Sequence, residues 1–300
     1  MRNQTDIRHD ITNAIIDALQ NNPDSLPPWR KPWCDDPNSG LPTSLSTGRR
    51  YAGINTLILQ CSAMKQGFKS RWWGTFNQIK HAGSCVRKGQ KSTKIVLWKP
   101  IKRTRVDEHG KDTDDNFMVM REFAVFNCEQ TTGLDEFRVG HTKPDNDTAP
   151  RYQHADDVID ATGATINYGG NRAFYSPSDD TISMPFRHQF ETPEAFFETC
   201  FHELCHFAES RTGFDRTKPE NSYSFGELVA EMGSCFLMGE LGLPTTDNLE
   251  NHAAYLKSWL SAMAEDSKFI FKASAQASKA SDFLLSFSRT TEDKAEPLLT

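Results

Sequence analysis

The chain contains 300 residues, of which 37% are hydrophobic and 25% charged, a composition typical of globular proteins with one large or two ordinary domains. Its seven cysteines are an odd number with no C-x-x-C spacing, which speaks against a disulfide framework and a cysteine-rich zinc ribbon. No run approaches the roughly 20 apolar residues that span a bilayer, and the charged N-terminus does not have the apolar core of a signal peptide. We therefore expect a cytoplasmic protein that has no membrane partner.

The net charge of −6 is divided unevenly along the chain. Residues 1–140 contain 21 Lys and Arg against 15 Asp and Glu, whereas residues 141–300 contain 13 against 25, so that the two parts carry +6 and −12. The run 37–106 contains fourteen basic residues and no acidic one. A surface of this charge attracts polyanions.

Apolar spacing and turn residues predict a mixed α+β first half. The segment PPWRKPW, at 27–33, is predicted to be an extended surface segment because proline is excluded from helix interiors. The acidic, glycine-bearing stretch 106–116 is predicted to be a hairpin loop. Helices are predicted over 6–22, 53–67 and 73–83, and strands over 93–100 and 117–127.

A polar, proline-bearing stretch at 138–150 has little apolar content to bury and indicates a boundary between domains. We predict one domain over 1–140, a linker over 141–150 and a second domain over 151–300.

The second half is predicted to begin with short strands and to continue with helices. Thr192 has the residue type of a helix N-cap and is followed by Pro193, which suits the first helical position. Strands are predicted over 164–169 and 173–185, the latter a hairpin with its turn at 177–180. Helices are predicted from Thr192 to about 213, from Ser224 to about 242, and over about 248–265 and 272–288.

The segment CFHELCHFAE contains two histidines, His202 and His206, at the HExxH spacing used by zinc peptidases. On the predicted helix they lie on one face, one turn apart, and can share a tetrahedral cation. Glu203 is rotated by about 100° from its neighbour, beside the metal, where a base can deprotonate a water molecule. Two imidazoles favour Zn²⁺ as the cofactor without excluding Mn²⁺.

A third protein ligand is expected on the next helix, in the segment SYSFGELVAEMGSCF. Glu227 follows His206 by 21 residues, and Glu231 lies one turn later on the same face. We assign Glu227 as the ligand and Glu231 as the acid that orients a ligand histidine through its free N–H. An alternative stays open, because Ser224 and Glu227 also have the spacing of a capping box. If Glu227 only caps the helix, Glu231 becomes the ligand.

Basic and aromatic residues are interleaved in and just before the acid-free run. Cations follow the phosphates of single-stranded nucleic acid, and rings stack on exposed bases without reading a sequence. The competing interpretation places the aromatics in the core, but the loops PPWRKPW and GRRY are bounded by proline and glycine and favour contact. The predicted DNA contacts are Trp29, Arg30, Lys31, Trp33, Arg49, Arg50, Tyr51, Trp72, Trp73, Lys88, Lys91 and Lys94.

These segments resemble the ArdC-type antirestriction proteins. PPWRKPW, STGRRYAGINTLIL and WGTFNQIKHAGSCVRKGQKSTKIVLWK are similar to their N-terminal domain, which also occurs in plasmid primases. AFYSPSDDTISMP, CFHELCHF and SFGELVAEMGSCFL resemble the zincin-type, gluzincin-like metallopeptidase domain that follows it. The resemblance implies a protein of conjugative plasmids that binds single-stranded DNA without sequence preference and protects incoming DNA from restriction. It places His202, Glu203 and His206 on the zincin motif and Glu227 on the third ligand.

Three functions fit these features. The first is an antirestriction protein with a single-stranded DNA-binding half and a zinc peptidase half. The second is a DNA-dependent metalloprotease, similar to Spartan-type proteases, whose substrate is a protein bound or crosslinked to DNA. The third is a binding module with a structural metal, which the intact Glu203 speaks against, because a structural zinc site fills all four positions with protein ligands and needs no base.

Overall fold

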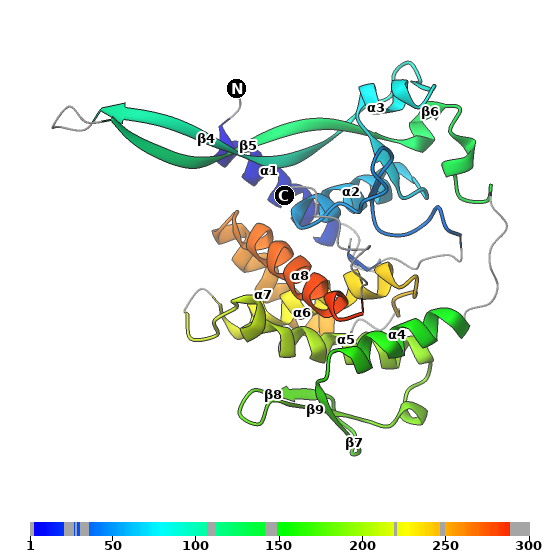
Figure 1. The fold of residues 1–300 in the computed structure, drawn as a ribbon, viewed down its shortest axis with the longest axis vertical. Helices are drawn as coiled ribbons and strands as arrows, with labels where there is room; N and C mark the ends of the chain where they lie inside the picture. Colours follow the sequence, from blue (N-terminus) through cyan, green and yellow to red (C-terminus); the bar gives the residue numbers. More distant parts are fainter. Residues whose placement is uncertain are drawn as a thin grey trace.

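The computed structural model describes residues 3–20, 27, 29–30, 36–106, 112–141, 149–218, 221–246 and 250–288. The predicted α+β class is confirmed, because helices and short sheets occur together in both halves of the chain (Figure 1). Lys31 and Trp33, two of the predicted DNA contacts, lie outside the described residues. Within the described ranges, no helix combines the length and the apolar content needed to cross a membrane.

The first half combines helices with a four-stranded sheet and a separate pair of short strands. Its predicted helices and strands are confirmed, except that Trp73 and Gly74, at the start of the predicted helix 73–83, lie in a strand. The strand order of the larger sheet is β1-β2-β5-β4, parallel between β1 and β2 and antiparallel elsewhere, while β3 pairs with β6. The elements are α1 (Gln4–Gln20), β1 (Thr43–Ser44), α2 (Ile54–Gln66), β2 (Trp72–Gly74), α3 (Phe76–His81), β3 (Cys85–Val86), β4 (Thr93–Val106), β5 (Asp112–Asn127) and β6 (Thr131–Thr132).

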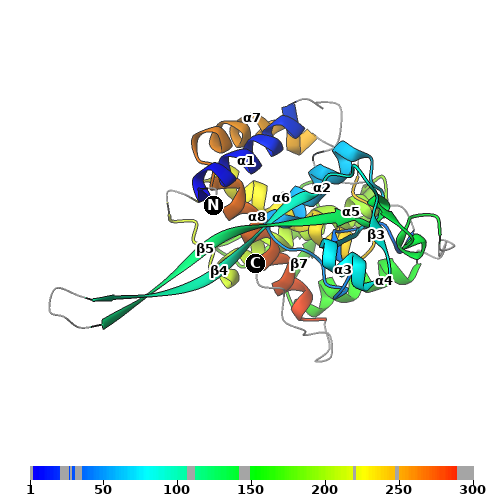
Figure 2. The ribbon, with the colours of Figure 1, turned by 90° about the horizontal axis from the view of Figure 1, so that it is seen from above.

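Strands β4 and β5 form an arm that projects beyond the rest of the molecule in both views (Figures 1 and 2). They pair in continuous antiparallel register over the whole of β4. The strands therefore extend into both ends of the stretch predicted as a loop, 106–116, and that prediction is wrong at its margins; residues 107–111 lie outside the described residues. Near its base the arm is fixed to α2, because the Asn55 side chain donates to the Val96 carbonyl and accepts from the Val96 N–H.

Local sequence signals explain where the helices of the first half begin and end. α2 ends at Gly67, whose φ of 74° lies in the left-handed region that glycine adopts without strain. α3 begins at a capping box, in which Thr75 accepts from the Gln78 N–H and the Gln78 side chain accepts from the Thr75 N–H.

The second half packs helices against a three-stranded sheet of order β7-β9-β8, which lies below α4 and α5 in Figure 1. The predicted β8–β9 hairpin is confirmed, and β7 adds in parallel to β9. Helix α4 was not predicted; it begins at Ala149, inside the predicted linker 141–150, so the domain boundaries remain predictions. The elements are α4 (Ala149–Ala161), β7 (Thr165–Tyr168), β8 (Phe174–Ser176), β9 (Thr181–Met184), α5 (Pro193–Glu209), α6 (Tyr223–Glu240), α7 (Glu250–Glu265) and α8 (Phe269–Ser286).

The first of two large hydrophobic clusters joins the two halves of the chain. It packs Ile15 of α1 and Leu57 of α2 together with Leu228 of α6. Trp29 is fully buried in the same cluster and meets Trp259 of α7 edge-on, with 6.4 Å between the ring centroids. The halves are therefore packed on each other and share a core.

The second large cluster lies within the second half and holds α5 in place. Phe196, Phe197 and Phe201 of α5 are 1%, 1% and 0% exposed, and they pack with Ile182 of β9 and Leu237 of α6. Burial of this face fixes the orientation of the helix that carries the two predicted metal-binding histidines.

Candidate metal centre

Two packed helices bring the predicted metal ligands together. His202 and His206 lie one turn apart on α5, with their ring centroids 4.9 Å apart, and Glu227 lies near the start of α6. Their two Nε2 atoms are each 3.4 Å from a different oxygen of the Glu227 carboxylate. One ligand atom from each of the three side chains lies within 4.8 Å of the other two.

This arrangement fits a divalent cation with tetrahedral geometry. Ligand atoms about 2.0–2.1 Å from a tetrahedral zinc ion stand about 3.3–3.4 Å apart, and both nitrogen–oxygen separations match that spacing. Imidazole nitrogens and a carboxylate oxygen are donors that suit zinc and also manganese. Three protein ligands from the described residues leave a fourth position open, as in catalytic zinc sites.

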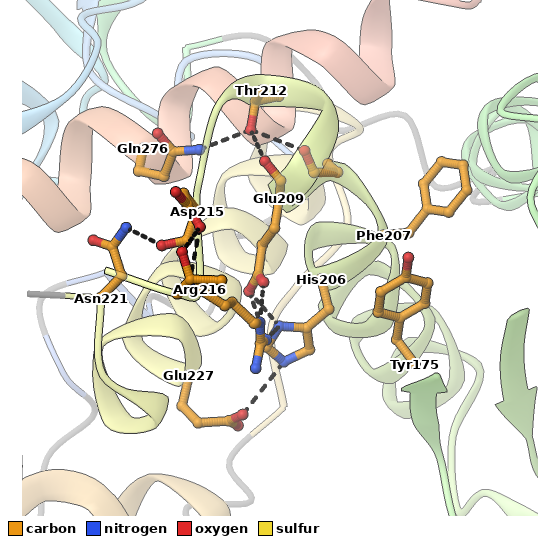
Figure 3. Close-up of polar contacts among 12 residues, drawn as sticks. Tyr175, His206, Phe207, Glu209, Thr212, Asp215, Arg216, Asn221, Glu227 and Gln276 are labelled. Carbon is orange, nitrogen blue, oxygen red and sulfur yellow. Dashed lines mark hydrogen bonds and ion pairs between the residues drawn. The ribbon is translucent and has the colours of Figure 1, made fainter. Parts of the chain in front are cut away.

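A buried carboxylate orients the ring of His206 (Figure 3). The Nδ1 atom of His206 lies 2.7 Å from Oε1 of Glu209. When Nε2 binds a metal ion, Nδ1 carries the proton and donates a hydrogen bond to Glu209, which fixes the ring orientation and makes the imidazole a stronger ligand. Arg216 donates to both Glu209 oxygens, one of them at 2.8 Å. The Nη2 atom of Arg216 also lies 2.9 Å from Nδ1 of His206. Because both atoms are donors, they do not bond each other, and each donates to Glu209 instead.

Glu231 does not have the role predicted for it. Its carboxylate accepts from Arg30, with 2.6 Å between Arg30 Nε and Oε1, and the contacts described for the two ligand histidines are with Glu209 and Glu227 instead. The prediction that Glu231 orients a histidine is therefore wrong, and Glu209 has this role for His206. A signal for Glu209 was present in the sequence, because a residue three positions after His206 on a helix lies beside it.

The capping-box alternative does not describe the start of α6. The N-cap is Ser222, whose side chain accepts from the N–H of Phe225. Glu227 therefore lies inside the helix, beyond the cap, where its carboxylate meets both histidines. This placement favours Glu227 over Glu231 as the third ligand.

The charges of the three ligand side chains are coupled. Burial lowers the pKa of His206, but hydrogen bonds to Glu209 and Glu227 outweigh burial and raise the pKa to about 9. Burial raises the pKa of Glu227, but hydrogen bonds from His202 and His206 outweigh it and hold the pKa well below its ordinary value. The cluster therefore binds a proton tightly, and a divalent cation competes with that proton for the same nitrogen.

Glu203, the predicted base, lies on α5 directly after His202 and is 8% exposed. In zinc peptidases with this spacing, the glutamate after the first ligand histidine accepts a proton from the metal-bound water. Its catalytic role remains a prediction.

Part of the predicted DNA-contact set lies in the core. Trp29 and Trp73 are 0% and 1% exposed, so neither ring offers a face on which a base could stack. Arg30 is 6% exposed, and its guanidinium pairs with Glu198 and Glu231 of the second half. For these three side chains the predicted DNA contact is wrong, because packing between the halves or inside the first half buries them.

A second part of the set is half-buried. Arg50 pairs with Glu240 of α6 and Asp282 of α8. Trp72 is half-buried in β2, and Tyr51 packs beside the core, where burial raises the pKa of its hydroxyl to about 12. These side chains serve packing and the contact between the halves in this structure.

The remaining members of the set are accessible. Lys88 and Lys91, in the turn between β3 and β4, are exposed, and Arg49 is half-buried. Lys94, on β4, is exposed and stands 3.5 Å from Glu122. Among the described residues, the predicted contact with DNA therefore stays a candidate for these four side chains.

Comparisons with known proteins match the two halves of the chain to two different family models. Residues 5–126 match the family model for the N-terminal domain of anti-restriction factor ArdC, and residues 153–276 match that of a zincin-like metallopeptidase. Two DNA primases named TraC, both from Escherichia coli, are 38% and 36% identical over 90% and 87% of this chain. The chain spans only 27% and 19% of the length of those primases. An uncharacterized protein y4eC of Sinorhizobium fredii (strain NBRC 101917 / NGR234) is 29% identical over 93% of this chain and 92% of that protein.

Two crystal structures of an antirestriction ArdC protein from plasmid R388 have a similar fold. The metal-free structure is 33% identical, with a TM-score of 0.77, over 94% of this chain and 98% of that one. The Mn(II)-bound structure is 32% identical, with a TM-score of 0.74, over 95% of this chain and 99% of that one. A relative of this fold thus binds a divalent cation of the kind that two imidazoles and a carboxylate accept.

Proposed function

This chain belongs to the ArdC-type antirestriction proteins, and from that premise we propose that it binds single-stranded DNA and protects incoming plasmid DNA from restriction. The first half would hold the DNA without sequence preference, and the second would carry a zinc peptidase centre. The observation that carries the proposal is the cluster of His202, His206 and Glu227 in a chain whose other half has a long acid-free, basic run.

The charge distribution supports DNA binding by the first half. The acid-free run 37–106 covers α2 to β4, and Lys88, Lys91 and Lys94 are exposed on it. Residues 141–300 carry −12 and repel a polyanion, so DNA would approach the peptidase centre by way of the first half.

Affinity for oligonucleotides tests this part of the proposal. Because the halves share a core, the full chain is the right material. We expect single-stranded oligonucleotides of unrelated sequence to bind with similar affinity, which falls steeply as salt rises because bound counterions are released. A preference for duplex DNA, or an affinity that does not change with salt concentration, would contradict the proposal.

The geometry of the centre supports peptide hydrolysis. His202, His206 and Glu227 would hold a zinc or manganese ion, which would supply a Lewis acid for a peptide carbonyl. Glu203 accepts a proton from the attacking water and returns it to the departing amine. Glu209 keeps the His206 ring in the tautomer whose Nε2 is free to bind the metal.

The intact base favours a second candidate function. Coating DNA requires cations and rings but no catalytic carboxylate, so Glu203 indicates that proteolysis is used. The alternative function is a DNA-dependent metalloprotease that cleaves proteins bound or crosslinked to DNA.

Conjugation of plasmids carrying Glu203→Gln separates the two functions. The substitution should keep the metal and the affinity for DNA, because this side chain is not assigned to either, and should abolish cleavage because the base is lost. If coating protects the DNA, the variant transfers into a restricting recipient as well as the wild type does. Transfer as poor as that of a deletion would make proteolysis central. A non-restricting recipient is the control, and a wild type without advantage in the restricting recipient would refute antirestriction.

A further inference from the structure

We propose that a phosphate group of the bound DNA strand occupies a cation-lined pocket formed by Lys69, Arg87 and Arg138 in the first half. The identity of the ligand rests on the DNA binding proposed above. The pocket has a volume of about 280 Å³ and is lined by these three side chains together with Glu129 and Val139. None of them belongs to the set of DNA contacts predicted from the sequence.

Two guanidinium groups converge in this pocket. Arg87 Nη1 and Arg138 Nη2 each donate to the same atom, the carbonyl oxygen of Thr131, at 3.0 Å. The two nitrogens are therefore no more than 6.0 Å apart, since each is 3.0 Å from one shared oxygen. Like charges at this distance repel each other, and a phosphate beside both groups removes the repulsion. Because Arg87 also donates to the Glu129 carbonyl, its position is fixed before a ligand arrives.

Arg138 has a donor that the protein itself does not use. Its Nη1 lies 2.9 Å from Asp135 and its Nη2 bonds Thr131, whereas its buried Nε has no hydrogen-bond partner in the part of the chain that the structure describes. Because this Nε is itself buried, a ligand in the pocket would meet the guanidinium through its accessible outer nitrogens and its charge. A phosphate oxygen is the acceptor that guanidinium groups bind best.

The acidic groups near the pocket already have partners. Glu129 Oε1 accepts from the backbone N–H groups of Lys69 and Ser70 at 2.7 and 2.6 Å. Asp135 pairs with the Nη1 edge of Arg138. The lining therefore has three cationic side chains against one carboxylate, whose charge is partly neutralised by two amides.

Arg87 connects the pocket to the β3–β4 turn, which also carries two exposed lysines. Gln130 holds this turn, because its carbonyl accepts from the Arg87 N–H at 2.9 Å and its amide donates to the Lys91 carbonyl at 2.8 Å. Lys88 and Lys91 thus lie on the same turn as Arg87. A strand with one phosphate in the pocket would have its neighbouring phosphates beside these lysines, which is how a basic groove follows a single strand.

Charge reversal at Lys69 tests the proposal in the full-length protein. Lys69→Glu leaves the Glu129 contact intact, because Lys69 makes it with its backbone N–H. We expect the affinity for a single-stranded oligonucleotide to fall about tenfold, with a salt dependence weaker by about one unit of slope. Arg87→Lys keeps the charge but loses the planar fork, and it should weaken binding as well. Lys257→Glu, at an exposed position of α7, is the matched control and should change neither quantity.

Inorganic phosphate tests the pocket without DNA. Phosphate at constant ionic strength should raise the unfolding temperature of the wild type more than that of Lys69→Glu, because it binds only the intact pocket. The two proteins are compared because phosphate also stabilises proteins without a site, and equal unfolding temperatures in chloride show that the variant folds. Equal stabilisation of both proteins by phosphate would overturn the pocket. Equal oligonucleotide affinity of the wild type and both pocket variants would overturn its DNA role, whereas a wild type that binds no DNA would refute the proposed function itself.

Discussion

Replacing Glu209 by glutamine tests how the metal centre is held. The buried carboxylate accepts from His206 Nδ1 at 2.7 Å and is paired with Arg216. A hydrogen bond to a charged group contributes about 1.5–3 kcal/mol and a neutral one about 0.5–1.5 kcal/mol, so Glu209→Gln should cost about 1–2 kcal/mol of metal binding. This corresponds to a metal affinity that is about 5- to 30-fold weaker.

The assay is competition for Zn²⁺ with a chromophoric chelator, followed by unfolding of the same samples. Glu231→Gln is the matched control, because the same substitution is made at a buried glutamate that contacts Arg30 instead of a ligand histidine. It should leave the metal affinity within about twofold and lower the free energy of unfolding by about 1–3 kcal/mol. A larger loss of metal affinity in Glu231→Gln than in Glu209→Gln would refute the reasoning.

Three further changes test the rest of the assignment. Glu227→Ala should abolish stoichiometric metal binding in elemental analysis, because it removes the carboxylate of the cluster; one ion retained per chain would contradict it. Trp29→Ala should lower the free energy of unfolding in denaturant by about 3–5 kcal/mol, because the ring is buried between the halves; weaker DNA binding with unchanged stability would argue for a surface role. Chelation of the metal should leave the affinity for single-stranded DNA unchanged, because the exposed basic side chains proposed to bind DNA lie in the first half. An affinity that depends on the metal would show that the two sites are coupled.

The metal ligands could be predicted because their arrangement follows from helix geometry. Residues four apart on a helix share a face, which places His202 beside His206 wherever the helix lies. The prediction of Glu227 as a ligand required only that the next helix pack on α5. Glu209 was not predicted although its spacing is just as regular, because Glu231 on the second helix offers an acid at an equally regular position.

The DNA contacts could not be predicted in the same way, because local composition does not show what a loop packs against. Trp29 and Arg30 are in a proline-bounded segment with the composition of a surface loop, yet Arg30 pairs with Glu231, 201 residues away in the chain. The pocket of Lys69, Arg87 and Arg138 is assembled from separate segments around one carbonyl oxygen, so its residues share no sequence pattern.

The hydrophobic cluster shared by the two halves limits how such a gene can be cut and recombined. A break between residues 141 and 149 would expose Trp29 and Leu57 on one fragment and Leu228 on the other, and each fragment would be prone to aggregate. Recombination that moves both halves together leaves this interface intact. The similarity to the two longer Escherichia coli primases accordingly runs through both halves, over 90% and 87% of this chain. For evolution, as for the design of fusion proteins, the transferable unit is the pair of halves.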